Sequence, residues 1–319
     1  MSEKKLPRVV VIGGGTGMPV LLRGLKNLPI ELTALVTVAD DGGSTGRIRS
    51  EMDIPAPGDI RNVIAALSDA EPMLLELFQH RFSEGNGLSG HSMGNLLLAA
   101  MTSVTGNFNN GIKEISRVLN VKGKIYPISN ENMTLHALME DGTIVSGESN
   151  IPLTGKKIKR VFIRPQPVEP LPNAVRAIDA ADLIVISPGS LYTSIMPNLI
   201  IPHVKEALRD AKAKVVYVCN VMTQAGETTG YTVSDHVHAI CDHIGDECLD
   251  ALVVHNEVID KSIRDIYAEE NAEPVEYDME QLLDMGLEII EGDIIDYSQS
   301  MLRHDNNKIA KLLYSIMEK

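Results

Sequence analysis

The chain has 319 residues, of which 44% are apolar, and carries a formal net charge of −14 with a pI near 5.1. This length and apolar content suffice for a substantial hydrophobic core. The negative charge argues against general nucleic-acid binding, which depends on neutralising backbone phosphates. An anionic ligand would therefore need basic residues gathered locally.

The sequence predicts a cytoplasmic protein without membrane insertion. No apolar run approaches the roughly 20 residues that span a bilayer, and residues 1–5 are not followed by the apolar stretch of a signal peptide. The three cysteines, Cys219, Cys241 and Cys248, are odd in number and lack C-x-x-C spacing. We therefore expect buried free thiols, with neither a disulfide framework nor a zinc site.

A glycine-rich turn follows the first predicted strand. Residues 8–12 read as a buried strand and residues 18–28 as an amphipathic helix. Between them, backbone N–H groups and the positive end of a helix dipole can approach a phosphate without interference from Cβ atoms. The alternative is a tight turn without a ligand. The candidate ligand-binding residues here are Gly13, Gly14, Gly15, Thr16 and Gly17.

The same turn fits the dinucleotide fingerprint only in part. Gly13 and Gly15 occupy the first two places of G-x-G-x-x-G, but Met18 occupies the third. NAD is therefore one candidate ligand, and the turn is better described as a general anion-binding feature.

Two acidic residues end the second predicted strand, residues 32–39. Asp40 and Asp41 precede Gly42, and the loop continues to Arg47. Paired carboxylates suit a ribose or a divalent cation such as Mg²⁺ held beside phosphates, and Arg47 supplies positive charge. The alternative is an acidic turn at the surface.

Two further polar segments precede helices. Asp59 is placed as a helix N-cap, followed by Arg61 and Asn62 in the first turn, where a cation is unfavourable for the dipole and suggests a functional reason. A helix that continues to residue 101 is opened by His91 and Asn95. His91 is either a general acid or base, or a helix cap.

The pattern of residues 121–168 differs from that of the preceding segments and predicts short strands joined by turns. We expect an antiparallel addition to the main sheet or a small subdomain. Its position makes it a candidate contact between two copies in a homodimer.

The alternation of strands and helices then resumes, and two more strand ends carry polar loops. Residues 187–191 follow one strand and are suited to an anion or sugar. Residues 220–224 follow the next, where amide side chains can read a base or sugar. The histidines at 236, 238 and 243 lack the spacing of a compact metal site. The candidates are Ser187, Pro188, Gly189, Ser190, Leu191, Asn220, Met222 and Gln224.

Six motifs occur in an order that closely resembles the YvcK family of gluconeogenesis factors, which belongs with the CofD-like fold. The likeness covers nearly the whole chain. The motifs are the glycine turn at 13–17 and residues 39–46, 57–62, 90–95, 187–194 and 220–224.

This resemblance implies a Rossmann-like, three-layer, mostly parallel α/β sheet in a single domain over residues 1–319, with a β-rich insertion around 121–168. It also implies a cytoplasmic factor needed for cell shape and envelope synthesis during gluconeogenic growth. Such a factor binds UDP-sugars such as UDP-N-acetylglucosamine, has no established catalysis, and acts through a regulatory protein partner. Residues 302–304 look like the family's Leu-Arg-His motif, which assigns Arg303 to the ligand's diphosphate.

Two rival functions stay open. CofD itself is a magnesium-dependent transferase, and Asp40 and Asp41 match its paired aspartates, although the following loop differs. On that reading the aspartates would hold Mg²⁺ during transfer of a phosphoryl group. The partial dinucleotide fingerprint supports the other rival, an NAD-binding protein.

Overall fold

The computed structural model describes residues 5–269, 271–297 and 303–317, apart from the side chains of residues 262, 263 and 303. A seven-stranded parallel sheet forms the centre, in the order β10-β9-β8-β7-β1-β2-β3. The bounds are β1 Arg8–Gly13, β2 Glu31–Val36, β3 Lys124–Pro127, β7 Leu183–Ile186, β8 Lys214–Val218, β9 Ala251–His255 and β10 Glu288–Gly292. The expected Rossmann-like sheet is confirmed.

The strand order reverses between β1 and β7. β1 pairs with both, placing Val11 beside Ala34 on β2 and beside Val185 on β7. From β1 the chain moves outward to β2 and β3, and from β7 it moves the opposite way to β8, β9 and β10. In open parallel sheets such a reversal opens a crevice outside the carboxyl ends of the two central strands, and ligands bind there.

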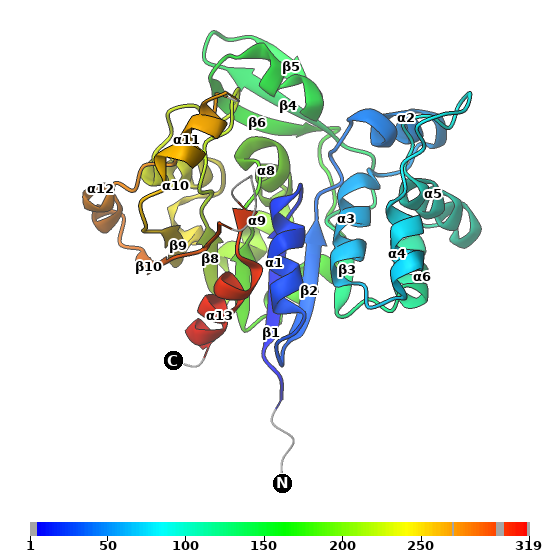
Figure 1. Ribbon diagram of the computed structural model, residues 1–319, viewed down its shortest axis with the longest axis horizontal. Coiled ribbons are helices and arrows are strands. Elements are labelled where there is room, and N and C mark those ends of the chain that lie inside the picture. The colour runs from blue at the N-terminus through cyan, green and yellow to red at the C-terminus, as the bar shows by residue number, and fades with distance from the viewer. Residues whose placement is uncertain (1–4, 270, 298–302, 318–319) are drawn as a thin grey trace.

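Helices cover both faces of the sheet (Figure 1). They are α1 Gly17–Leu25, α2 Gly43–Met52, α3 Gly58–Leu67, α4 Pro72–Gln79, α5 Met93–Thr105, α6 Phe108–Val118, α7 Pro172–Asp179, α8 Met196–Leu199, α9 Pro202–Arg209, α10 Val233–Ile244, α11 Lys261–Ala268, α12 Met279–Asp284 and α13 Asn306–Met317. Within the described residues, no helix is both long and apolar enough to cross a membrane.

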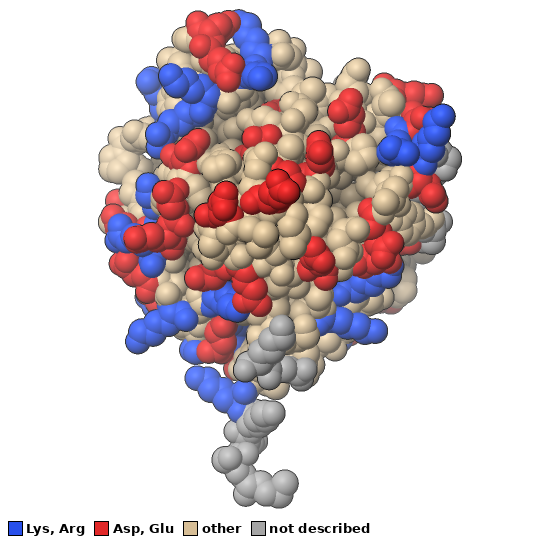
Figure 2. Space-filling view, turned by 90° about the vertical axis from the view of Figure 1, so that its left-hand side faces the viewer, with Lys and Arg blue, Asp and Glu red and all other residues tan. Residues whose placement is uncertain are grey.

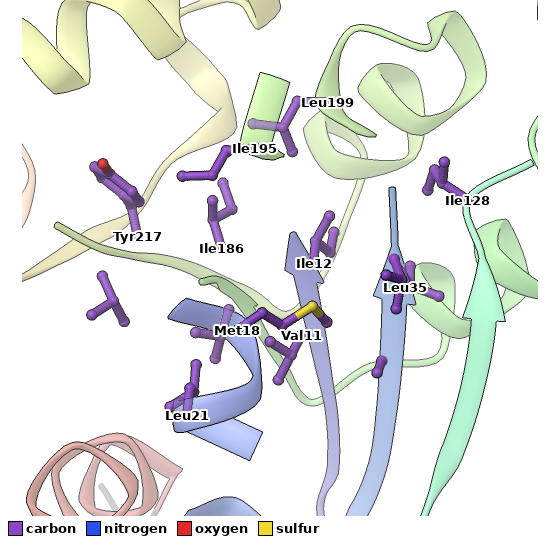
Figure 3. Close-up of a cluster of buried hydrophobic side chains, with 14 of the residues drawn as sticks. Val11, Ile12, Met18, Leu21, Leu35, Ile128, Ile186, Ile195, Leu199 and Tyr217 are labelled. Carbon is purple, nitrogen blue, oxygen red and sulfur yellow. The ribbon is translucent and has the colours of Figure 1, made fainter. Parts of the chain in front are cut away.

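The core explains why residues 9–12 of β1 are an uninterrupted apolar run. Successive side chains of a strand point to opposite faces, and here both faces are covered. Val11 lies toward Met18 and Leu21 of α1, while Ile12 lies toward Ile195 on the other side (Figure 3). All five side chains are fully buried. The strand and the glycine turn that follows it are therefore held rigidly.

A separate three-stranded antiparallel sheet lies beyond the carboxyl ends of the central strands (Figure 1). Its order is β5-β4-β6, with β4 Thr134–Met139, β5 Ile144–Ser146 and β6 Ile158–Arg164, and two short helical turns follow β5, η1 Glu148–Asn150 and η2 Pro152–Thr154. The expected insertion at 121–168 is too wide, because β3 joins the central sheet beside β2. Four residues are too few for the sequence to show whether an edge strand pairs in a parallel or an antiparallel direction.

Candidate functional site

The β1–α1 turn packs directly against the loop after β7. A Cβ on Gly17 would lie 2.3 Å from the carbonyl oxygen of Pro188, and a Cβ on Gly13 would lie 2.1 Å from Ser187 Oγ. Gly15 has φ +64°, a conformation that glycine adopts without steric cost. The predicted glycine turn and the predicted 187–191 loop thus meet at the point where the strand order reverses.

Asn220 fixes the second of these loops. Its Oδ1 accepts from Gly189 N at 3.0 Å and its Nδ2 donates to Gly189 O at 2.7 Å. Gln224 Nε2 donates to Ser190 Oγ at 2.8 Å, while Gln224 Oε1 is buried without a partner. Asn220 therefore supports the loop, and the side-chain oxygen of Gln224 is left unpaired. Leu191 is fully buried, so it supports the loop from within the core.

A cleft of about 450 Å³ opens beside these loops. Its lining includes Thr16, Gly17, Gly189, Ser190 and His304. Met222 and Gln224 also line it. An adjoining cavity of about 680 Å³ shares Asn220, Val221 and Ala272 with the cleft. Together they form one elongated depression over the carboxyl ends of β7, β8 and β9.

The two parts of this depression differ in charge. The larger cavity is lined by four carboxylates and one arginine, namely Glu257, Asp265, Glu273, Glu276 and Arg264. The smaller cleft is bordered by glycine and hydroxyl residues and by His304. Burial lowers the pKa of His304 to about 4, and its Nε2 lies 3.4 Å from Cys219 O. His304 is therefore neutral at neutral pH.

Asp59 holds the glycine turn from the opposite side. Its Oδ2 accepts a hydrogen bond from Gly15 N at 2.9 Å, and burial raises its pKa to about 7. The expected N-cap role is wrong, because Pro57 occupies that position and Asp59 lies in the first turn of α3. Asp59 was therefore not predicted as part of this candidate site. Its signal was an acid in a glycine- and proline-rich loop preceding a helix.

Asp40 and Asp41 use their carboxylates differently. Asp40 Oδ1 accepts from Gly42 N at 2.9 Å. Asp41 accepts from Glu148 N at 3.1 Å and Ser149 N at 2.9 Å, so it fastens the small sheet to the central one. The described residues contain no group of three or more metal-ligating side chains placed around one point. Asp41 is therefore committed to η1 through these two hydrogen bonds.

Glu148 adds a further carboxyl above the same loops. Burial, followed by the charges of Asp40, Asp41 and Asp59, raises its pKa to about 8. The small sheet therefore brings a protonated carboxylic acid toward the carboxylates of the central sheet. Nothing in the local sequence distinguishes Glu148 from an ordinary turn residue.

His91 and Asn95 meet at Ser44, which belongs to α2. Ser44 Oγ lies 3.0 Å from His91 Nδ1 and accepts from Asn95 Nδ2 at 3.2 Å. The cap of α5 is Ser92, whose Oγ accepts from Asn95 N. The helix-cap interpretation of His91 is therefore wrong. These residues join α2 to α5 in a buried polar cluster.

The predicted arginines are dispersed. Arg47 is exposed and donates to Ser89 O at 2.8 Å, and Arg61 donates to Asn62 Oδ1 at 2.8 Å. Arg303 lies in β12 (Arg303–His304), which pairs with β11 (Ile295–Asp296), but its side chain lies outside the described residues.

Arg49, which was not predicted from the sequence as a candidate, is buried in this region. It is 8% exposed and donates to the backbone oxygens of Asp40 and Met133 and to Asn132 Oδ1. It therefore ties the end of β2 to the segment that enters the small sheet.

Comparison with known proteins decides the family. The chain is 54% identical to the gluconeogenesis factor of Bacillus subtilis (strain 168) over 318 residues, covering 100% of both chains. It is also 56% identical to the gluconeogenesis factor of Halalkalibacterium halodurans over 309 residues, covering 97% of this chain and 96% of the relative. The chain belongs to the gluconeogenesis factor (YvcK) family. The family profile described as 2-phospho-L-lactate transferase CofD matches residues 9–295, so this gluconeogenesis factor has the CofD-like fold.

Solved structures agree with this assignment. A Bacillus halodurans protein of the UPF0052 family superposes with a TM-score of 0.95 at 55% identity, covering 98% of this chain and 100% of that one. A second crystal structure from Bacillus halodurans gives a TM-score of 0.96 at 56% identity, covering 97% and 100% of the two chains. The gluconeogenesis factor fold thus extends over essentially the whole sequence.

Proposed function

We propose that this gluconeogenesis factor binds a nucleoside diphosphate sugar of the UDP-N-acetylglucosamine type. The observation that carries the proposal is the glycine turn, packed against the 187–190 loop where the strand order reverses. The diphosphate would lie in the 450 Å³ cleft, facing Gly17 and Ser190.

The first turn of α1 supports this placement. Thr16 is the N-cap, but its side chain makes no capping hydrogen bond. The first amides of an α-helix have no partner within the helix, so they are available to an anion. Neither glycine nor threonine adds a charge that would oppose it. The arrangement supplies a neutral cradle of backbone donors.

The adjoining cavity suits the uncharged parts of the ligand. Its carboxylates, such as Glu257 and Glu276, would repel a phosphate but accept hydrogen bonds from sugar hydroxyls or a base N–H. Gln224 Oε1 provides another acceptor near the junction. The change of charge along the depression therefore favours the phosphate end of an elongated ligand in the smaller cleft and its uncharged end in the larger cavity.

The role that follows is regulatory. We propose a cytoplasmic ligand-dependent factor that acts through a protein partner on envelope synthesis and cell shape during gluconeogenic growth. Mg²⁺, if required, would arrive with the diphosphate and contact Asp40, since the protein ligands alone are too few.

A CofD-like transferase is the second candidate, and one observation favours it. Asp59 and Glu148 carry carboxyls whose pKa values are raised to about 7 and about 8. A carboxyl that titrates near neutrality can donate or accept a proton during group transfer. If the protein is a transferase, Asp59 and Glu148 would donate and accept protons during the reaction in addition to shaping the site.

Calorimetric titration with UDP-N-acetylglucosamine, NAD and GTP, each with and without Mg²⁺, tests these functions. Chromatography of the mixtures then shows whether each ligand is recovered intact. The proposal expects the UDP-sugar to bind and return unchanged. Conversion of a nucleotide, or binding of GTP alone, would favour the transferase, and binding of NAD alone would favour the dinucleotide alternative.

A further inference from the structure

A second cavity lies between the small antiparallel sheet and the central body of the molecule. Its volume is about 650 Å³, which is within the range of pockets that hold small organic ligands. One wall is β6 of the small sheet, and the opposite wall is α9. None of the described residues that line this cavity also lines the depression over β7, β8 and β9. The cavity is therefore separate from the candidate site.

The base of the cavity is apolar. Val161 and Ile163 of β6 and Ile201, which precedes α9, are buried there as part of the hydrophobic core. Ile200 beside them is half-buried, and Pro167 is exposed. Because the core holds these side chains in place, the base keeps its shape without a ligand. The apolar part of a ligand would leave water on entering, which is favourable.

The rim of the cavity is basic, although the chain as a whole is acidic. Arg160 and Arg209 are exposed at the rim and Lys205 is half-buried, whereas Glu206 is the one carboxylate among the described lining residues. The whole chain has 43 acidic and 29 basic residues, so this excess of cations is a local feature. Figure 2 shows acidic side chains spread across the middle of one face and basic side chains gathered at the upper left, at the height of the small sheet.

Two of the cations lie close to the same histidine. Lys205 Nζ donates to the backbone oxygen of His243 at 3.3 Å. Burial lowers the pKa of the His243 ring, and the charges of Arg160 and Lys205 lower it further, which places both cations nearby. In the part of the chain that the structure describes, neither Arg160 nor Lys205 has a carboxylate within ion-pair distance, whereas Arg209 pairs with Asp210 at 2.9 Å. Two positive charges at this cavity therefore lack a carboxylate partner.

We propose that this cavity binds a small amphipathic anion, with its apolar body against β6 and its carboxylate, phosphate or sulfonate group facing Arg160 and Lys205. Guanidinium and ammonium groups form their strongest hydrogen bonds with such anionic oxygens. A neutral ligand would leave both cations without a counter-ion, and a cationic ligand would be repelled. The ligand contacts the small sheet and the central body at once, so it would hold the two together. The proposal does not depend on the nucleotide sugar, because the two cavities share no lining residue.

Larger acidic partners fit this place less well. An acidic protein segment would meet further carboxylates around the rim, since Glu206 faces His203 at 3.0 Å and Glu169 lies 3.7 Å from the same ring. Both carboxylates are exposed. An anionic membrane binds apolar side chains that project from the surface, whereas Val161 and Ile163 are buried at the base of a cavity. A small ligand can reach this base and still place its anionic group at the rim.

Fluorescence titration with anilinonaphthalene sulfonate tests the proposal, because this probe combines an apolar body with one sulfonate. Phenylnaphthylamine, which has the same rings without the sulfonate, is the neutral counterpart. Arg160→Gln should weaken binding of the sulfonate by about tenfold and leave binding of phenylnaphthylamine unchanged. Gln166→Glu, which adds a carboxylate to the lining at an exposed position, should also weaken binding of the sulfonate.

Lys159→Gln is the matched control, since Lys159 is the exposed neighbour of Arg160 in β6 but does not line the cavity. It should bind both probes as the wild type does. The proposal is overturned if the wild type, Arg160→Gln and Gln166→Glu bind the sulfonate equally, or if Lys159→Gln weakens binding as much as Arg160→Gln. Decyl phosphate should displace the probe from the wild type. Displacement by a polyglutamate peptide or by phosphatidylglycerol vesicles, but not by decyl phosphate, would assign the cavity to a protein or a membrane and also overturn the proposal.

Discussion

Gly15 N donates a hydrogen bond to Asp59 Oδ2 at 2.9 Å, which joins the glycine turn to the first turn of α3. A Cβ on neighbouring Gly14 would lie 2.6 Å from the same oxygen. The turn thus has its shape fixed by a carboxyl from a distant part of the sequence.

The titration of Asp59 predicts a pH dependence of stability. Its folded pKa of about 7 lies above the ordinary value of 3.8, so the folded state binds the proton more tightly. Stability from this group is therefore greatest at low pH and is lost as the pH rises from about 4 to about 7, by up to about 1.4 kcal/mol per pH unit. Asp59→Asn keeps an acceptor for Gly15 and removes the titration.

Urea unfolding of both proteins between pH 4 and 8 checks this prediction. The free energy of unfolding of the wild type should fall relative to that of Asp59→Asn across the interval. Parallel curves for the two proteins would show that Asp59 does not titrate there. Glu148→Gln provides a second comparison, because the pKa of Glu148 is raised to about 8.

Removal of the Asp41 carboxylate should loosen the small sheet. Asp41→Ala deprives the amides of Glu148 and Ser149 of their acceptor, with an expected cost of about 1 kcal/mol. Hydrogen exchange at these two amides should accelerate. Asp141→Ala, which breaks an exposed pair with Lys156 in the same sheet, should leave their exchange unchanged.

Asn220→Ala should release the loop after β7. The substitution removes both hydrogen bonds to Gly189, and each bond contributes about 1 kcal/mol. We expect a lower urea midpoint and a tenfold or greater loss of affinity for UDP-N-acetylglucosamine. Asn86→Ala, in an exposed loop, should change neither quantity. Unchanged affinity in Asn220→Ala would separate this loop from the binding site.

His243 should make the attachment of β6 sensitive to acid. Its Nε2 accepts from Val161 N at 3.0 Å and its Nδ1 donates to Ala239 O, so the ring is neutral. Burial lowers the pKa of His243 below the ordinary 6.5. Stability from this group is present above pH 6.5 and is lost as the pH falls below it. Exchange of the Val161 amide, corrected for intrinsic rate, should accelerate at pH 5, and equal protection at pH 5 and 7 would contradict this role.

Much of the fold was predictable because buried parallel strands leave a strong pattern. The strand predicted at 8–12 is β1, which extends one residue further to Gly13. β4 was expected only as one of the short strands of 121–168, because its less buried face carries Thr134, His136 and Leu138 and so lacks a clear polar alternation. The π-helical turn at Leu191–Ile195 likewise has no local pattern that distinguishes it from a loop.

The close approach of the glycine turn to the 187–191 loop was predictable, but the partners of the polar side chains around it were not. Glycines at strand ends indicate where a backbone approaches closely, as at Gly13 and Gly17. The partner of each polar side chain depends on tertiary contacts between distant segments, so the roles of Asp41 and Asp59 could not be read from their neighbours in sequence. The same limit applies to Asn220, which fixes a loop.

The central claim is that a diphosphate lies against the β1–α1 turn. Calorimetric titration of Gly17→Ala with UDP-N-acetylglucosamine tests it most directly, because the added Cβ would lie 2.3 Å from Pro188 O and would displace the two loops from each other. Gly292→Ala is the control, where the nearest atom is the flexible Leu312 Cδ2 at 3.3 Å. We predict binding by the wild type and the control, with at least a tenfold loss in Gly17→Ala. Equal affinity in all three proteins would contradict the claim.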